Sequence, residues 1–283
     1  MRASKRELIV TYSVLAALLL LFTFLDLPLS QAVFNLKSPF GRFFEIFGET
    51  PGLLVGAFSA AALFVTRDRK TLWKNILSVL GFGLLALLFS LMGALMVNNY
   101  LTHGDLSMAV ILPEGLVLFA LLLFLASRLD MAKRAEIRRA AIVGLLLLVA
   151  AIVVINLIKI GWGRPRLRSM TDPAAQFTPW YLPQSVAAGE EFKSFPSGHT
   201  ANAAVLLWIT LLPAFINKLK GKEALLLVLA WAWVALVALS RIVMGAHFGS
   251  DVTMGAILTY TVFVALRAWK YRAAGKQQTV KSA

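Results

Sequence analysis

The sequence predicts an all-α integral membrane protein with about eight transmembrane helices. Of its 283 residues, 59% are hydrophobic and 15% are charged, whereas a soluble domain has roughly 45–50% apolar and about 25% charged residues. The apolar residues are gathered in long runs, each close to the ~20 residues that a helix needs to cross a bilayer. Basic residues recur between these runs. Together these observations exclude a soluble globular protein.

The expected spans are apolar runs that are bounded by charges or by helix-breaking residues. They lie near residues 8–27, 52–66, 75–97, 107–127, 139–159, 198–216, 223–241 and 247–266. The second run is short, so its helix could be tilted or partly interfacial. In the segment 28–50, phenylalanines are interspersed among polar residues, and we expect this segment to lie along the membrane surface.

The placement of Lys and Arg predicts the orientation of the chain, because cytoplasmic loops are enriched in both. If the N-terminus is cytoplasmic, every segment assigned to that side carries at least three basic residues. We therefore expect a multi-pass protein of the cell membrane with both termini in the cytoplasm. The first run is expected to be retained as a helix, since it is of spanning length and Ser30-Gln31-Ala32 is a poor cleavage site.

Charge and composition also exclude several classes of function. The formal net charge of +14 would suggest a nucleic-acid partner in a soluble chain, but basic loops account for it in a membrane protein. There is no cysteine, so disulfides, thiolate nucleophiles and thiolate metal sites are excluded. We expect no nucleic-acid partner, no metal and no cofactor, and the oligomeric state is left open.

Three polar clusters stand at the expected outer ends of consecutive spans. The first follows the fifth run and holds Lys159, Arg164, Arg166 and Arg168. Glycines and a proline between these residues end helices and free the backbone. Cations beside a membrane often attract headgroups or snorkel, and they can equally bind a phosphate.

The second cluster is Pro196-Ser197-Gly198-His199, which lies directly before the sixth run. Such residues are common helix caps. Alternatively, the free N–H groups and the positive dipole end of the helix form an anion site. The Ser197 hydroxyl and His199 would then project into that site.

The third cluster contains Arg241, His247 and Asp251 around the start of the last run. If the segment is helical, His247 and Asp251 share one face, since they are four residues apart. A carboxylate there can fix the tautomer of the imidazole and raise its basicity, although an isolated pair of this kind is often a structural hydrogen bond. Ionisable groups within the bilayer are costly and are usually functional.

Together the clusters bring cations, a helix start and two histidines to one side of the membrane. Cations around a tetrahedral oxyanion form charge-assisted hydrogen bonds that strengthen as charge develops during phosphoryl transfer. The combination therefore indicates phosphoryl-transfer chemistry more strongly than any one cluster does.

The clusters resemble the three motifs of the type 2 phosphatidic acid phosphatase (PAP2) family, which shares its site with vanadium haloperoxidases. The first motif is Lys, six residues and Arg-Pro, and the spacing from Lys159 to Arg166 matches it. The second, Pro-Ser-Gly-His, is identical to residues 196–199, and the third fits residues 240–251. Leu167 departs from the pattern, because proline is usual at that position.

The resemblance implies a role for each matching residue. His247 would attack phosphorus and form a phosphohistidine, while Asp251 orients and charges it. His199 would protonate the leaving oxygen and then activate water. The phosphate oxygens would be held by Lys159, Arg166, Arg241, the Ser197 hydroxyl and the Gly198 amide. This scheme requires no metal.

The resemblance covers about residues 150–266 and so divides the chain into three parts. It implies a PAP2-like helical catalytic core at 150–268 in the C-terminal half. The core would follow N-terminal transmembrane helices at 1–149, about four and a half spans, and precede a basic cytoplasmic tail at 269–283.

Four further charged residues lie outside the matched motifs. Arg164, Arg168 and Lys193 are expected to bind an anionic headgroup or a second phosphate. Glu114 lies inside the fourth run, where an acid is unusual, and it has either a function or a structural partner.

The resemblance implies a metal-independent membrane lipid-phosphate phosphatase with an extracytoplasmic site. Its substrate would be a lipid phosphomonoester or diphosphate, such as a polyprenyl (undecaprenyl) diphosphate, phosphatidic acid or phosphatidylglycerophosphate. Two alternatives stay open. One is a lipid phosphotransferase that uses the same site, and the other is a non-catalytic protein that binds or transports lipid phosphates.

Overall fold

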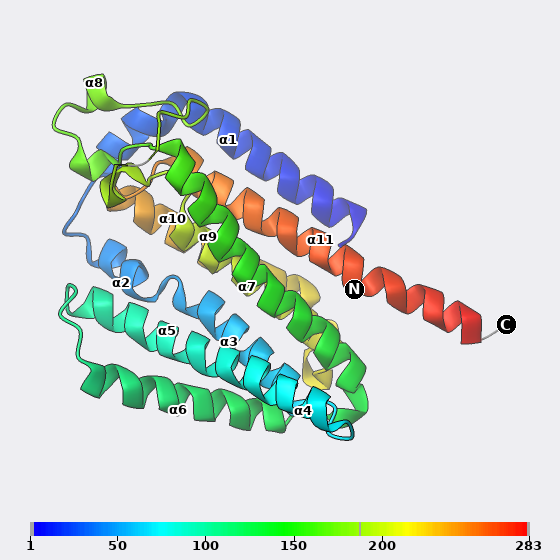
Figure 1. Ribbon diagram of the computed structural model, residues 1–283. Helices are drawn as coiled ribbons and strands as arrows, with labels where there is room; N and C mark the ends of the chain where they lie inside the picture. The colour runs from blue at the N-terminus through cyan, green and yellow to red at the C-terminus, as the bar shows by residue number, and fades with distance from the viewer. Residues whose placement is uncertain (1–2, 187, 282–283) are drawn as a thin grey trace.

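The computed structural model describes residues 3–186 and 188–281. In this part of the chain every regular element is a helix. The long helices lie side by side in one bundle and run between its two ends (Figure 1). Among the described residues, seven segments are long and apolar enough to cross a membrane. The predicted all-α membrane class is confirmed.

The elements fall on either side of a long loop, residues 163–197. Before it the chain forms α1 (Lys5–Val33), α2 (Pro39–Phe47), α3 (Thr50–Val65), α4 (Leu72–Ser78), the π-helical turn η1 (Val79–Gly83), α5 (Leu84–Leu101), α6 (Met108–Ser127), η2 (Met131–Lys133) and α7 (Arg134–Trp162). In and after the loop it forms η3 (Leu167–Ser169), α8 (Pro173–Gln176), η4 (Glu190–Phe192), α9 (Gly198–Ala204), η5 (Val205–Ala214), η6 (Asn217–Leu219), α10 (Glu223–Val243) and α11 (Gly249–Lys281).

The sixth predicted run does not form a single α-helix. Its first 7 residues form α9, and the next 10 form the 3-10 helix η5. A 3-10 helix rises about 2.0 Å per residue, against about 1.5 Å in an α-helix. The two pieces together therefore extend roughly 30 Å, which is the thickness of the hydrocarbon core of a bilayer. This run accounts for the difference between eight predicted spans and the seven segments found.

Local sequence signals explain several helix ends. Ser4 caps α1 by accepting a hydrogen bond from the Glu7 amide at 2.9 Å, and Ser38 caps α2 directly before Pro39. Both serines and the proline are preferred at helix starts. α7 ends at Gly163, whose φ of 64° lies in the left-handed region that glycine adopts without strain. The chain can therefore turn sharply from α7 into the long loop.

The short second run forms α3, which lies in the centre of the bundle. Its neighbours include α5, α6, α7 and α9, and Leu53, Ala57 and Ala61 are at most 1% exposed. Small residues allow these neighbours to approach closely. At Gly52, for example, a Cβ would lie 2.2 Å from the backbone oxygen of Asn202 in α9. α3 is therefore a core helix and not an interfacial one.

The helices α1 and α2 differ in their surroundings. α1 lies against α11 at the edge of the bundle (Figure 1), and its buried residues are Leu15, Asp26 and Ser30. α2, which belongs to the predicted surface segment 28–50, packs on α10 and buries Phe44 there. The position of this segment relative to a membrane surface stays a prediction.

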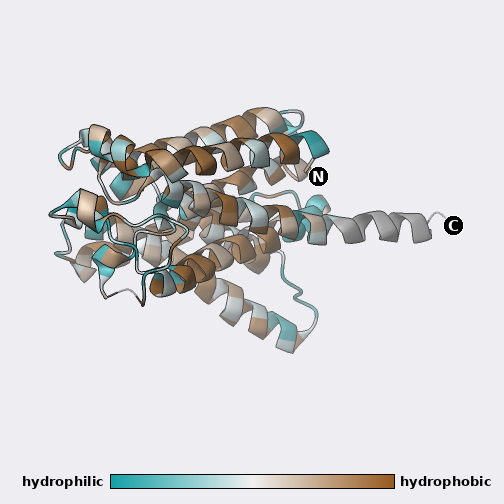
Figure 2. Ribbon diagram, turned by 90° about the horizontal axis from the view of Figure 1, so that it is seen from above, coloured by the Kyte–Doolittle hydropathy of each residue, from teal (hydrophilic) through white to brown (hydrophobic). Residues whose placement is uncertain are grey.

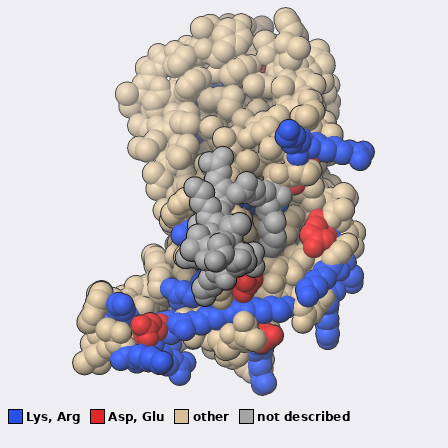
Figure 3. All heavy atoms as spheres, turned by 90° about the vertical axis from the view of Figure 1, so that its right-hand side faces the viewer, with Lys and Arg blue, Asp and Glu red and all other residues tan. Residues whose placement is uncertain are grey.

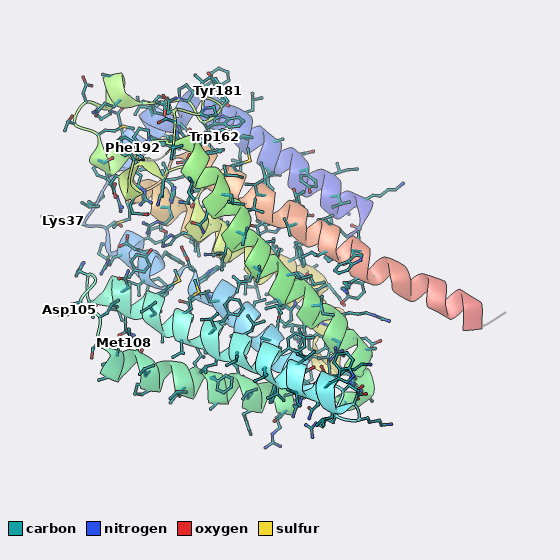
Figure 4. The ribbon with its side chains drawn as sticks, in the orientation of Figure 1. Lys37, Asp105, Met108, Trp162, Tyr181 and Phe192 are labelled. Carbon is teal, nitrogen blue, oxygen red and sulfur yellow. The ribbon has the colours of Figure 1, made fainter. Side chains whose placement is uncertain are left out.

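The loops that follow α1, α5 and α7 gather at one end of the bundle, where Figure 4 shows Lys37, Asp105 and Trp162. The two chain ends lie toward the opposite end (Figure 1), and Lys and Arg side chains gather over the lower part of that face (Figure 3). Apolar residues run along the helices between the two ends (Figure 2). α11 continues into the predicted tail as far as Lys281, and residues 282–283 lie outside the described residues.

Candidate active site

A cavity of about 390 Å³ lies among α2, α5, α7, α9 and α10, beside the start of α3, and residues of all three polar clusters line it. Its basic side chains are Lys159, Arg166, Arg168, Lys193 and Arg241, and its carboxylates are Glu45, Glu49 and Glu190. Five cations against three anions give the cavity a net positive charge. Such a cavity attracts anionic ligands.

The first cluster supplies cations from the end of α7 and the loop after it. Lys159 Nζ donates to the carbonyl oxygen of Lys193 at 2.8 Å. A Cβ at Gly198 would lie 3.9 Å from the same Nζ, so the ammonium group lies beside the start of α9. Arg166 lines the cavity, and its buried Nε has no hydrogen-bond partner among the described residues. Leu167, which replaces the proline of the motif, begins the turn η3 and is buried.

The second cluster forms the start of α9. Ser197 Oγ accepts a hydrogen bond from the Thr200 amide at 3.3 Å, and Ser197 is fully buried. Its hydroxyl caps the helix and is not among the groups that line the cavity, so its predicted role in holding a phosphate stays untested. Gly198 and His199 do line the cavity.

His199 contacts an acceptor with each of its ring nitrogens. Nδ1 lies 2.7 Å from Glu49 Oε1, and Nε2 lies 3.3 Å from the carbonyl oxygen of Glu45. Both contacts can be hydrogen bonds at once only when the ring carries a hydrogen on each nitrogen. These surroundings suit a protonated imidazole, which is the form that a general acid needs.

His247 has different surroundings. Its Nδ1 donates to the carbonyl oxygen of Ser194 at 2.6 Å, which leaves the lone pair of the neutral ring on Nε2. Burial lowers the pKa of His247 well below its ordinary value, because a charged ring would lose its hydration there. A neutral imidazole that lines the cavity is the form that a nucleophile needs.

Asp251 lies within ion-pair distance of His247 but makes no hydrogen bond with it. Its Oδ2 lies 3.8 Å from His247 Nδ1, which is too far for a hydrogen bond. Oδ2 instead accepts from Ser194 Oγ at 2.6 Å and from the Phe248 amide at 2.8 Å. The predicted role of Asp251 in orienting and charging His247 stays a prediction. Ser194 links the two residues: its hydroxyl donates a hydrogen bond to Asp251, and its carbonyl oxygen accepts one from His247.

Arg241 reaches the cavity from the end of α10. Its Nη2 donates to Glu45 Oε1 at 3.0 Å. Its Nε and Nη1 are buried and have no partner within the part of the chain that the structure describes. Free buried donors are costly, so an anion that accepts hydrogen bonds from them would bind favourably.

Arg164 is a buried residue with structural partners, and a role in binding a headgroup stays an untested prediction. Its side chain is 0% exposed and does not line the cavity. The guanidinium donates to Asp26, Asp251, Ser250 and the carbonyl oxygen of Thr178. A buried cation is tolerated here because two carboxylates and further acceptors surround it. A local basic cluster in the sequence does not reveal such burial.

Arg168 and Lys193 line the cavity and are paired within the long loop. Arg168 donates to the two oxygens of Glu191 at 2.7 and 3.1 Å, and Lys193 Nζ lies 2.5 Å from Glu190. The hydrogen bond from Arg168 lowers the pKa of Glu191, and that from Lys193 lowers the pKa of Glu190. A role of these two cations in binding a headgroup or a second phosphate stays a prediction.

Sequence reasoning missed Asp26, Glu45 and Glu49, which are all buried. Each is an acid within or beside an apolar segment, and such an acid is a functional signal. Glu45 and Glu49 are also four residues apart, a spacing that favours a shared helical face. Glu114, by contrast, accepts from Asn98 Nδ2 at 2.6 Å and lies outside the cavity. These contacts favour the structural alternative for Glu114.

Fold and cavity together define a multi-helix membrane protein with a positively charged cavity that two histidines line. Within the described residues, no group of three or more His, Asp or Glu could hold a metal ion. The family model of the PAP2 superfamily matches residues 139–274. This match lies in the C-terminal half of the chain and supports a membrane phosphatase of the PAP2 family. No curated protein and no solved structure gave a match.

Proposed function

We propose that this protein is a lipid-phosphate phosphatase that hydrolyses a lipid phosphomonoester or diphosphate through a phosphohistidine at His247. The observation that carries the proposal is the meeting of His247, His199 and three motif cations at one cavity. The unpartnered guanidinium donors of Arg166 and Arg241, as far as the described residues go, add to it. A phosphate oxygen would accept from these donors.

In the first step, Nε2 of His247 attacks phosphorus as the bond to the leaving oxygen breaks. His199 gives its Nε2 proton to that oxygen, so the lipid leaves as an alcohol or a monophosphate. Lys159, Arg166 and Arg241 bind the oxygens on which charge develops. Nδ1 of His247 keeps its hydrogen and continues to donate it to the Ser194 carbonyl oxygen, which stabilises the positive ring that forms.

In the second step, His199 accepts a proton from water, and the water oxygen attacks phosphorus. The N–P bond breaks, inorganic phosphate leaves, and His247 returns to its neutral form. His199 is protonated again at the end of the cycle, and the two steps need no redox partner and no metal.

A lipid is the substrate class that the cavity walls favour. Met92 and Met96 of α5 and Ile152 and Ile155 of α7 line the cavity beside its charged groups. An apolar wall next to a phosphate site fits a molecule with a phosphate head and a hydrocarbon tail. Polyprenyl diphosphate, phosphatidic acid and phosphatidylglycerophosphate all have this form.

We also propose that the site is extracytoplasmic. Residues of the loop 163–197 line the cavity. This loop lies at the end of the bundle away from the two chain ends (Figure 1). Loops at the opposite end are richer in Lys and Arg, as cytoplasmic loops are.

The test is phosphate release from the three lipids in detergent micelles with EDTA present. Wild type is compared with His247→Ala and with His103→Ala, a histidine of the turn between α5 and α6 that does not line the cavity. We expect wild type and His103→Ala to release phosphate and His247→Ala to be at least about a thousandfold slower. The order of rates among the lipids would narrow the substrate.

Two results would overturn the proposal. One is a wild type that releases phosphate from none of the lipids, and the other is a His247→Ala variant as active as wild type. Transfer of the phosphate to a second lipid instead of water would favour a phosphotransferase.

A further inference from the structure

Glu49 contacts His199 from outside the region that matches the PAP2 family. It stands directly before α3, whereas the family match begins at residue 139. Its Oε1 lies 2.7 Å from His199 Nδ1, and its Oε2 accepts from Asn202 Nδ2 at 2.8 Å. Glu49 is 8% exposed. Both oxygens of a nearly buried carboxylate are thus bound by residues of α9.

The packing of α3 on α9 holds Glu49 in this position. Gly52 lies one turn after Glu49, and a Cβ there would lie 2.2 Å from the backbone oxygen of Asn202. Only glycine allows this approach. Asn202 follows His199 by three residues, so both lie on the same face of α9. The close approach therefore brings the carboxylate to two side chains of one helix face.

Glu49 is an unexpected residue in a cavity that attracts anions, because it repels a phosphate. A buried carboxylate is retained only where its partners offset the cost of burial. Glu45, the neighbouring acid, binds the phosphate-site residue Arg241. Glu49 instead binds His199 and Asn202 and makes no ion pair with a motif cation among the described contacts.

We infer that Glu49 is a positioning residue for His199. It holds the Nδ1 hydrogen, so the ring presents Nε2 as the nitrogen that exchanges a proton with the leaving oxygen and then with water. It also faces the positive charge that the ring carries when Nε2 is protonated. A carboxylate that orients a catalytic imidazole in this way acts through the histidine and does not touch the substrate. This inference rests on the proposed function, because it needs His199 as the proton donor.

The inference predicts that the effect of Glu49 depends on the leaving group. An alkyl oxygen of a lipid needs a proton to leave, whereas p-nitrophenolate leaves readily without one. For Glu49→Gln we expect kcat for a lipid phosphate to fall about 10- to 100-fold, as for other partners of functional histidines. KM should change less than about threefold. The first-turnover release of p-nitrophenol from p-nitrophenyl phosphate should fall less than about threefold.

The matched control is Glu114→Gln, which changes an acid of the apolar helix α6 that lies outside the cavity. Its rates should equal those of wild type. Glu49→Asp, which keeps the charge, should recover part of the lost kcat. If Glu49→Gln does not fold, Asn202→Ala removes one partner of the carboxylate and should show a smaller loss with the same leaving-group dependence.

Three results for Glu49→Gln would overturn the inference and leave the proposed function standing. They are an equal fall in rate on the lipid phosphate and on p-nitrophenyl phosphate, a change in KM alone, and no fall in rate. A wild type that releases no phosphate from either substrate would overturn the proposed function and the inference with it.

Discussion

The two cavity histidines have different partners at their ring nitrogens. His247 has one acceptor, the Ser194 carbonyl, on Nδ1. His199 has an acceptor at each nitrogen, Glu49 at one and the Glu45 carbonyl at the other. The first arrangement suits a neutral ring and the second a protonated one. Side chains of one type can therefore take different parts in a single reaction because their surroundings differ.

We expect His247 to be neutral in the free protein at pH 6.5, because burial lowers its pKa well below that ordinary value. The neutral form is then favoured until the pH falls below the depressed pKa. The chain has three histidines, so ¹⁵N NMR of histidine-labelled protein yields few imidazole signals, and His247→Ala assigns the one in question. A His247 signal that titrates at or above pH 6.5 would contradict this prediction.

At the scale of single residues, the sequence predicts which residues belong to the site better than it predicts their contacts. The motif patterns were sufficient to single out His199, His247 and three of the five cations that line the cavity, Lys159, Arg166 and Arg241. They could not reveal Ser194 beside His247 or Glu49 beside His199, because these contacts are made across the fold and not along one helix. For the same reason, Arg164 was assigned to a headgroup although it is fully buried.

At the scale of elements, α2 and the residue before α3 form part of the cavity although they precede the family match. Glu45 lies in α2, and Glu49 lies between α2 and α3. α3 is also the helix whose small residues allow close packing on its neighbours. The N-terminal helices therefore contribute side chains to the candidate site and do not merely surround it.

Replacing Gly52 by Ala should separate α3 from α9. The added Cβ would lie 2.2 Å from the backbone oxygen of Asn202, and backbone cannot rotate away. We expect a loss of about 1–3 kcal/mol in the free energy of unfolding, as for other overpacked sites, and a fall in phosphate release as Glu49 is displaced. Thermal unfolding in detergent gives the first result. Gly81→Ala, where a Cβ meets nothing within 4 Å, is the control, and equal stability of the two variants would contradict the prediction.

The helix α1 is joined to the candidate site by a buried carboxylate. Asp26 accepts hydrogen bonds from Arg164, which also donates to Asp251. Asp26→Ala would leave the buried guanidinium short of one partner, and we expect a destabilisation on the order of 3 kcal/mol. Asp105→Ala, at an exposed position in the turn after α5, should leave the thermal unfolding temperature unchanged. The prediction is wrong if the two variants unfold at the same temperature.

At the scale of the whole molecule, apolar runs and basic loops were sufficient to predict the fold class. They could not show that the sixth run combines an α-helix with a 3-10 helix. Nor could they show that the short second run lies in the core, because hydropathy is the same for a buried face and a lipid-facing one. Placement inside the bundle depends on small residues such as those of α3.

The proposed orientation can be tested with single cysteines, since the chain has none of its own. Asp105→Cys lies in the turn after α5, and Arg69→Cys lies in the loop after α3 at the opposite end of the bundle. In intact cells, a membrane-impermeant maleimide should label Asp105→Cys, and it should label Arg69→Cys only after permeabilisation. The reverse pattern would place the cavity on the cytoplasmic side.

The covalent step at His247 is tested most directly by trapping the phosphorylated protein. Wild type is mixed with radioactive p-nitrophenyl phosphate, quenched in alkali and digested. We predict a label that is stable in alkali, labile in acid and located on the peptide that contains His247. The label should be absent from His247→Ala and should accumulate in His199→Ala, which lacks the base for hydrolysis. A label that persists in His247→Ala, or an active wild type that never becomes labelled, would contradict the phosphohistidine mechanism.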